Sequence, residues 1–263
     1  TELVNLFLSD NLKKTKLIDI GKDRNLSLDY LERELDSHEQ TEKILVVSVW
    51  SYGTRPDLHR LHSLKAKFGF KLLEDRCLAR PLIPEEFCDL NMNTDAYLFS
   101  TGYSKYCDLH YGGWLLDSLE AKSVVNNRNM NVDGYFHTIA SRRKIVDLQK
   151  EAVNNILETT IKNIAITDWK ADRWRLCVEV QRPELLKKFV ELQGGFCSNH
   201  YCTRHYQDDQ TFSTLEFHQK HVINFFNDLR VGQRYCENII EAACEYQNAL
   251  HNSCEIGQQE NYK

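Results

Sequence analysis

The sequence has no long apolar run. Its densest apolar stretch, residues 44–50, has the length of a buried strand, whereas a helix that spans a bilayer needs about 20 apolar residues. The first residues also lack the basic and apolar pattern of a secretory signal peptide. Only four prolines and eleven glycines occur among 263 residues, which leaves little room for long linkers. These absences indicate a folded chain, and we expect no membrane partner.

Neither sign of charge dominates. The 33 basic and 38 acidic side chains give a net charge of −5, whereas proteins that bind nucleic acid usually carry an excess of positive charge. We therefore expect no nucleic-acid partner. The nine cysteines are odd in number and scattered, and a chain of this length needs no disulfides to fold. We interpret them as free thiols in a reducing compartment and expect a cytoplasmic protein.

Strand-like and helical stretches alternate through the first half of the chain. Helices are expected after Ser27 and after Pro56. Strands are expected at residues 44–50, 71–75, 96–100 and 113–116. This alternation predicts an α/β fold with a mostly parallel sheet and helices on both faces. Such sheets bind ligands at the carboxyl ends of their strands, which is where Asp75 and Ser100 fall.

The rest of the chain shows a different pattern, which begins with a long helix at residues 141–161. The apolar stripe predicted on this helix consists of Ile145, Leu148, Ala152 and Ile156. A strand with one solvated face and three further helices are expected at residues 174–180, 183–193, 214–226 and 231–250. The change of pattern predicts a large α/β domain, residues 1–140, and a smaller α+β domain, residues 141–263.

Two segments combine residue types that hold a cofactor. One buried strand ends at Asp75 and another at Ser100, after which a turn leads to Lys105 and then to Gly112 and Gly113. In this order the sequence resembles the DegT-like nucleotide-sugar aminotransferases, which are fold-type I pyridoxal-phosphate enzymes related to aspartate aminotransferase. The resemblance covers most of the chain and is most specific at residues 51–57 (SYGTRPD), 72–75 (LLED), 99–105 (FSTGYSK) and 112–113 (GG).

This resemblance implies a homodimer that transfers an amino group from an amino acid such as glutamate to a nucleotide-linked keto-sugar. Its cofactor would be pyridoxal 5'-phosphate, bound covalently by Lys105, whose freed amine would then move the substrate proton. Asp75 would keep the pyridine nitrogen protonated, and the Ser100 hydroxyl would donate a hydrogen bond to the phosphate. Asn127 stands at the place of a family asparagine that reaches the phosphate of the neighbouring subunit.

The sequence departs from the family pattern at several positions. The large N-terminal segment of the family, with its Gly–Ser/Thr phosphate-binding turn, has no counterpart here, so we expect an incomplete large domain. Leu78 replaces a glutamine that contacts the ring hydroxyl of the cofactor, and Trp50 replaces a histidine. These departures leave a second hypothesis open, in which the chain is a catalytically inactive, truncated relative that serves in binding or assembly.

One loop of the C-terminal part forms another candidate site. Its Cys197, His200, Cys202 and His205 offer four zinc ligands, but their compact spacing would strain a tetrahedral site. We therefore predict no metal and keep a zinc-stabilised interaction module as a third hypothesis. In the resembling family a comparable segment lines the mouth of the active site, which implies that His200 and Tyr201 contact substrate.

Two smaller groups of charged or titratable residues have structural explanations. His59 and His62 lie three residues apart on one helix with no third metal ligand, so we interpret them as a surface pair. Arg142, Arg143 and Lys144 form a solvated start of the long helix, with a role in holding a diphosphate as the alternative.

Overall fold

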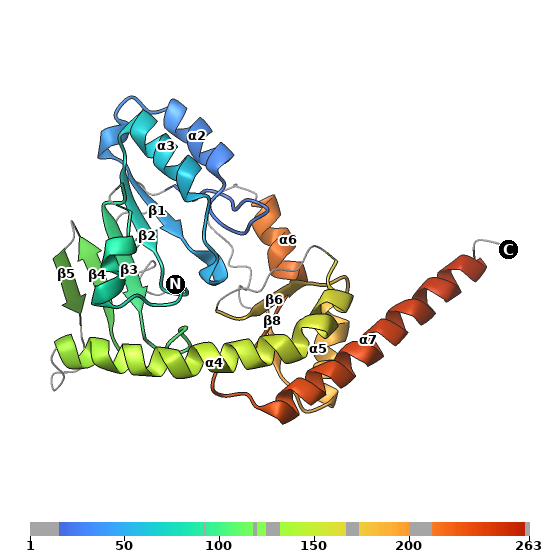
Figure 1. The fold of residues 1–263 in the computed structure, drawn as a ribbon. Coiled ribbons are helices and arrows are strands. Elements are labelled where there is room, and N and C mark those ends of the chain that lie inside the picture. Colours follow the sequence, from blue (N-terminus) through green and yellow to red (C-terminus); the bar gives the residue numbers. More distant parts are fainter. Residues whose placement is uncertain are drawn as a thin grey trace.

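Two β-sheets, one in each half of the chain, are joined by a long helix in the computed structural model (Figure 1). The structure describes residues 16–91, 93–117, 120–124, 132–166, 174–199 and 212–260. The first sheet has the strand order β1-β2-β3-β4-β5, and the second has the order β6-β8-β7. The strands of the first sheet are β1 (Leu45–Val49), β2 (Lys71–Asp75), β3 (Ala96–Ser100), β4 (Gly113–Asp117) and β5 (Glu120–Val124).

The first sheet is mostly parallel. Strands β1, β2 and β3 run in one direction, β4 runs against them, and β5 returns to their direction. Asp75 pairs with Val49 on one side and with Leu98 on the other, so the carboxyl ends of β1, β2 and β3 lie at one edge of the sheet. The predicted fold class is thereby confirmed. Strand β5 has no counterpart among the predicted strands.

Helices α2 (Leu28–Asp36) and α3 (Leu58–Phe68) cover one face of this sheet, and both begin at side-chain caps. Ser27 and Asp57 accept hydrogen bonds from backbone N–H groups in the first turns of these helices. Gly69 ends α3 with a left-handed φ of 74°. The core between helices and strands includes Leu31, Leu35, Val46, Leu61, Leu64 and Leu72.

The opposite face of β1 is exposed in the described structure. Leu45, Val47 and Val49 leave 58%, 44% and 40% of their surface open. Because side chains alternate between the faces of a strand, the register places Asp75 and Ser100 on this same open face. Helical cover of β1 is thus one-sided among the described residues, whereas the sequence predicts cover on both faces.

Helix α4 (Val132–Ile164) links the two sheets and runs along both of them (Figure 1). Its first turns pack Tyr135 and Ile139 against the first sheet, and its last turns pack Leu157 and Ile161 against the second. The helix predicted at residues 141–161 is therefore present and begins earlier than expected. Helix α4 contributes to both cores. The predicted division into two domains after residue 140 would fall inside this continuous helix, and it stays a prediction.

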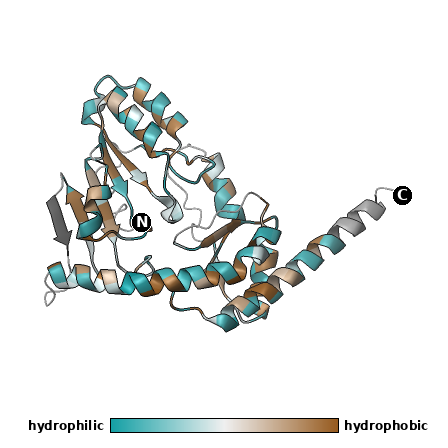
Figure 2. Ribbon diagram, viewed as in Figure 1, coloured by the Kyte–Doolittle hydropathy of each residue, from teal (hydrophilic) through white to brown (hydrophobic). Residues whose placement is uncertain are grey.

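The apolar stripe predicted on α4 lies on its exposed side. Ile145, Leu148 and Ile156 expose 53%, 69% and 48% of their surface. The buried side consists mainly of other apolar residues, among them Val146, Val153 and Leu157. It also contains Arg143 and Lys150, which bond to Glu86 and Asn227. Apolar residues therefore occur on both the buried and the exposed side of α4, which Figure 2 shows as a mixture of apolar and polar residues.

The second sheet forms the core of the C-terminal part, with β6 (Leu176–Glu179), β7 (Cys197–Ser198) and β8 (Val222–Phe225). All residues of β6 and β8 are buried, so the predicted solvated face of residues 174–180 is wrong. The end of the helix predicted at 214–226 is also wrong, because residues 222–225 form the central strand β8. This strand lies between β6 and β7, where β-branched residues pack well.

Three helices complete this part: α5 (Pro183–Leu192), α6 (Ser213–His221) and α7 (Gln233–Glu260). Helices α5 and α7 pack against the second sheet, and the C-terminal end of α7 projects away from the rest of the molecule (Figure 1). Within the ranges that the structure describes, no helix is both long enough and apolar enough to span a membrane.

Candidate active site

The loop between β3 and β4 carries Lys105 and is anchored at its base. Thr101 is fully buried, and its hydroxyl donates a hydrogen bond to the Tyr111 carbonyl oxygen at 2.7 Å. The same hydroxyl oxygen lies 2.5 Å from the Tyr135 hydroxyl, which must then be the donor. The Thr101 N–H donates to the Gly112 carbonyl oxygen at 3.1 Å. These bonds fix the points at which the loop leaves the sheet and returns to it.

Gly112 and Gly113 close this loop where no side chain fits. A Cβ on Gly113 would lie 2.6 Å from the Phe99 carbonyl oxygen. A Cβ on Gly112, whose φ is 84°, would lie 2.7 Å from the Tyr135 hydroxyl. The Gly-Gly pair of the predicted motif therefore has a steric role in shaping the loop.

Lys105 follows a strained residue. Ser104 has a φ of 62°, the left-handed region that is unfavourable for any residue with a Cβ. Asp108 holds this turn, because its carboxylate accepts hydrogen bonds from the N–H groups of Ser104 at 2.7 Å and His110 at 2.8 Å. The Lys105 N–H donates to the Gly102 carbonyl oxygen at 3.3 Å. The turn thus presents a half-buried lysine side chain beyond the carboxyl end of β3.

The charges of Asp75 and Lys105 both act on the thiol of Cys77. Asp75 ends β2, and its Oδ1 accepts a hydrogen bond from the Cys77 N–H at 2.9 Å. Burial raises the pKa of the Cys77 thiol, and the neighbouring Asp75 carboxylate raises it further. The positive charge of Lys105 acts on the same thiol in the opposite direction. Asp75 ends β2 and Lys105 lies in the loop that follows the neighbouring strand β3, so both belong to the same edge of the sheet.

Ser100 ends β3 on the same face of the sheet as Asp75. Its Oγ accepts a hydrogen bond from the Gly102 N–H at 3.3 Å. An accepted hydrogen bond leaves the hydroxyl proton of a serine available for donation. Asp75, Ser100 and Lys105 thus gather at one edge of the sheet, the position at which α/β sheets bind their ligands.

A cavity of about 180 Å³ opens beside Lys105, between the β3–β4 loop, α4 and the segment after β8. Its charged lining includes Lys105, Asp108, Arg142, Asp228 and Arg230. Burial of Asp228 favours the neutral carboxyl, but Asp228 accepts a hydrogen bond from Arg230 Nε at 2.8 Å. The interaction with Arg230 outweighs burial, so the pKa of the Asp228 carboxyl is lowered. Asp75 is not among the residues that line this cavity.

The basic cluster at the start of the predicted long helix is divided by the fold. Arg142 lines the cavity, whereas Arg143 is buried and forms a bidentate ion pair with Glu86, at 2.6 and 2.8 Å. Lys144 is exposed. The expectation of a solvated cluster is therefore wrong for Arg143, which ties α4 to the segment before β3.

Several predicted site residues fall outside the described part of the chain, namely Asn127, His200, Tyr201, Cys202 and His205. Cys197 lies in β7, where burial raises the pKa of its thiol to about 12. In the ranges that are described, no group of three or more His, Cys, Asp or Glu side chains is arranged to hold a metal ion.

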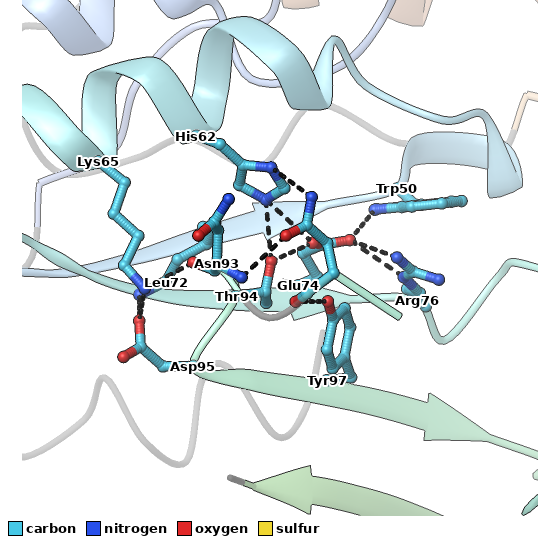
Figure 3. A network of polar contacts seen from close by, with 11 residues as sticks. Trp50, His62, Lys65, Leu72, Glu74, Arg76, Asn93, Thr94, Asp95 and Tyr97 are labelled. Atoms are coloured by element: carbon cyan, nitrogen blue, oxygen red, sulfur yellow. Dashed lines mark hydrogen bonds and ion pairs between the residues drawn. The ribbon is translucent and has the colours of Figure 1, made fainter. Parts of the chain in front are cut away.

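A buried polar network lies on the other side of β2 (Figure 3). Glu74 is fully buried and accepts hydrogen bonds from Arg76 Nε at 3.0 Å, Trp50 Nε1 at 3.1 Å and Thr94 Oγ1 at 2.5 Å. His62 Nε2 lies 3.0 Å from Thr94 Oγ1, so the prediction that His62 is a surface residue is wrong. Trp50, which replaces a family histidine, is thus part of this structural network.

Two residues with no motif signal in the sequence contact the turn that precedes Lys105. Trp174 Nε1 donates to the Ser104 carbonyl oxygen at 2.8 Å, and an Arg175 terminal nitrogen donates to Ser104 Oγ at 2.7 Å. Leu78, which replaces a family glutamine, packs with Trp174 in a small apolar cluster. Only the three-dimensional arrangement reveals these contacts, because about 70 residues separate Ser104 from its two partners.

No protein-family profile matches the sequence, and no curated protein matches it. Solved structures do match. A DegT/DnrJ/EryC1/StrS aminotransferase from Brucella abortus shares 12% identity at a TM-score of 0.67, over 88% of this chain and 72% of its own. The Helicobacter pylori aminotransferase PseC, involved in pseudoaminic acid biosynthesis, shares 13% identity at a TM-score of 0.67. This match covers 89% of this chain and 74% of PseC.

A putative sugar aminotransferase from Streptococcus pneumoniae, in its PMP form, shares 15% identity at a TM-score of 0.67, over 91% of this chain and 76% of its own. At such low identity these likenesses show the fold. The resemblance inferred from the sequence is therefore confirmed at that level: the chain has a fold-type I aminotransferase-like architecture, similar to that of DegT-like sugar aminotransferases.

Proposed function

We propose that this protein is a pyridoxal-phosphate-dependent aminotransferase that transfers an amino group from an amino acid such as glutamate to a nucleotide-linked keto-sugar. The observation that carries the proposal is the position of Asp75 and Lys105 at or beyond the carboxyl ends of the neighbouring strands β2 and β3. An acid and an amine are the two groups that pyridoxal chemistry requires. The fold shared with sugar aminotransferases supports the same function.

The polar groups at this edge of the sheet fit pyridoxal phosphate. The Asp75 carboxylate accepts the Cys77 N–H and retains capacity to accept a hydrogen bond from a pyridine N–H. Ser100 still has a hydroxyl proton to donate to the phosphate, and Lys105 offers its amine to the aldehyde. When bound, the cofactor supplies an electron sink for charge that develops at the substrate carbon.

Each of the three residues would then have a separate role. Asp75 would hold a proton at the ring nitrogen, because a carboxylate beside that atom stabilises its charged form. Lys105 Nζ would move a proton to and from the substrate carbon as a general base and acid. Ser100 would orient the cofactor through its phosphate. Asn127 and the pair His200 and Tyr201 remain proposed contacts to phosphate and substrate.

The cavity beside Lys105 supplies positive charge for an anionic substrate. Asp228 pairs with Arg230, whereas Arg142 is an exposed residue that also lines the cavity. A carboxylate or diphosphate that enters the cavity would therefore be attracted to Arg142. Both an amino-acid donor and a nucleotide-linked sugar carry such a group.

We also propose a cytoplasmic homodimer. The exposed stripe of Ile145, Leu148 and Ile156 on α4 is an apolar surface of the kind that a second copy covers. The exposed apolar face of β1 is a second such surface. The seven cysteines described by the structure are free thiols, which is consistent with a reducing compartment.

The proposal is tested by mixing the purified protein with pyridoxal phosphate and following the absorption of a covalent adduct, which borohydride reduction makes permanent. We expect an adduct in the wild-type protein and none in Lys105→Ala. Lys162→Ala is the matched control, because Lys162 is an exposed lysine of α4 that pairs with Glu158. Glutamate added to the unreduced wild-type adduct should change its spectrum as the amino group is transferred.

A non-catalytic relative is the second candidate, and the two family positions changed in this chain favour it. Leu78 packs in an apolar cluster, and Trp50 binds Glu74, so neither offers a polar contact to a cofactor. If no adduct forms at saturating pyridoxal phosphate, the enzyme proposal is wrong for this chain and the non-catalytic alternative is favoured.

A further inference from the structure

We propose that Trp174 and Arg175 are positioning residues that hold the backbone before Lys105 in its left-handed turn and thereby aim the lysine amine. This inference rests on the proposed function, in which Lys105 is the reacting amine. The two residues come from the segment before β6 in the C-terminal part, so this part of the chain would set the geometry of a lysine that belongs to the first sheet.

The turn at Ser104 is held from three sides. Asp108 accepts its N–H at 2.7 Å, Trp174 donates to its carbonyl oxygen at 2.8 Å, and Arg175 donates to its side-chain oxygen at 2.7 Å. Every polar group of this one residue therefore has a partner. A serine at φ 62° is unfavourable by itself, and such a conformation persists only where the surroundings determine it.

Trp174 is itself fixed by both halves of the molecule. Its N–H donates to the Tyr52 carbonyl oxygen at 3.2 Å, and the Tyr52 and Trp174 ring centres lie 6.3 Å apart. Its carbonyl oxygen accepts a hydrogen bond at 2.6 Å from Lys150 of α4. Lys150 is held further by the Asn227 side-chain oxygen at 2.7 Å. The Trp174 backbone is therefore held in place, and the indole beside the Tyr52 ring is buried, with 3% of the residue exposed.

Arg175 is equally well defined. It is 4% exposed, and its guanidinium carbon lies 4.1 Å from the Trp174 ring centre and 3.9 Å from that of Phe226. A guanidinium that is stacked between two rings has little freedom, so its hydrogen bond to Ser104 Oγ has a fixed direction. Because Ser104 immediately precedes Lys105, any rotation of its backbone displaces the lysine side chain.

The decisive variant is Arg175→Met, which keeps an unbranched side chain between the rings and removes the donor. We expect it to lower hydrogen-exchange protection of the Ser104 and Lys105 amides by roughly tenfold, the loss expected for one charge-assisted hydrogen bond. The covalent attachment of pyridoxal phosphate to Lys105 should slow by about the same factor. The control is Arg234→Met, because Arg234 is an exposed arginine of α7.

Rescue at Ser104 separates positioning from a general loss of structure. Glycine adopts a positive φ without strain, so Ser104→Gly should restore protection and attachment in the Arg175→Met background. Ser104→Ala keeps the strain and should not restore them. Ser104→Ala alone should reproduce the Arg175→Met effect, which keeps the test valid if Arg175→Met does not fold.

The outcomes distinguish this inference from the proposed function. Hydrogen exchange is measured without cofactor, so it does not depend on the proposed function. If the variants show the expected loss and rescue of protection but the protein never binds pyridoxal phosphate, the positioning role is supported and the proposed function fails. Unchanged protection and attachment rates in Arg175→Met would overturn the inference. Equal behaviour of the Ser104→Gly and Ser104→Ala double variants would overturn it as well.

Discussion

Removal of the Glu74 carboxylate is expected to destabilise the protein strongly. Glu74 is fully buried and Arg76, its partner at 2.8 Å, is 11% exposed at its side chain (Figure 3). Glu74→Leu would leave the Arg76 guanidinium buried without a counter-charge and would also remove the acceptor for Trp50 and Thr94. Breaking a buried ion pair from one side costs about 3–5 kcal/mol, and we expect a loss of unfolding free energy in that range.

The assay is urea denaturation at pH 7.5, with the unfolding free energy taken from linear extrapolation. Glu184→Leu is the control, because this glutamate side chain is 81% exposed, and its removal should change stability by less than about 0.5 kcal/mol. Replacing both Glu74 and Arg76 with leucine should recover at least half of the loss, since no unpaired charge then remains. If Glu74→Leu costs no more than the control, the reasoning about this network is refuted.

Three further predictions concern folding. Gly113→Ala should lower the melting temperature, because its Cβ would lie 2.6 Å from the Phe99 carbonyl oxygen. Leu157→Ala, at a fully buried position, should cost about 2–5 kcal/mol, whereas Leu148→Ala on the exposed side of the same helix should cost almost nothing in urea titrations. Burial lowers the pKa of His62, so the unfolded state binds the proton first, and stability should fall as pH drops below about 6.5. His62→Asn should flatten that pH dependence.

The strands of the first sheet were the most predictable part of the fold. Residues 71–75 and 96–100 form β2 and β3 with the bounds expected from their apolar runs, and both are followed by turn residues. The caps at Ser27 and Asp57 agree with the helices they precede. These signals are local, because one short segment contains both the element and its end.

The errors have physical causes that a single sequence does not reveal. Helix α4 has apolar residues on two sides, and only tertiary contacts decide which side is buried. The buried side includes Arg143 and Lys150, whose burial depends on pairing with distant Glu86 and Asn227. The segment at residues 222–225 (VINF) suits either a helix or a strand. It forms a strand because it pairs with β6 on one side and with β7 on the other.

The candidate site also contains some residues that the sequence predicts and others that it does not. Asp75, Ser100 and Lys105 follow from strand ends and from the resemblance to a family motif. Trp174 and Arg175 do not, because their contacts with Ser104 arise only when the two halves of the chain come together. Residues that support a reacting group from a distant segment carry no motif of their own.

The most direct test of the central claim is mass spectrometry of peptides from protein that has been treated with pyridoxal phosphate and then with borohydride. The account predicts a phosphopyridoxyl group on Lys105, with much less of it in Asp75→Ala, because the carboxylate that holds the ring nitrogen is gone. Labelling spread over exposed lysines such as Lys162 and Lys188, with none at Lys105, would contradict the account.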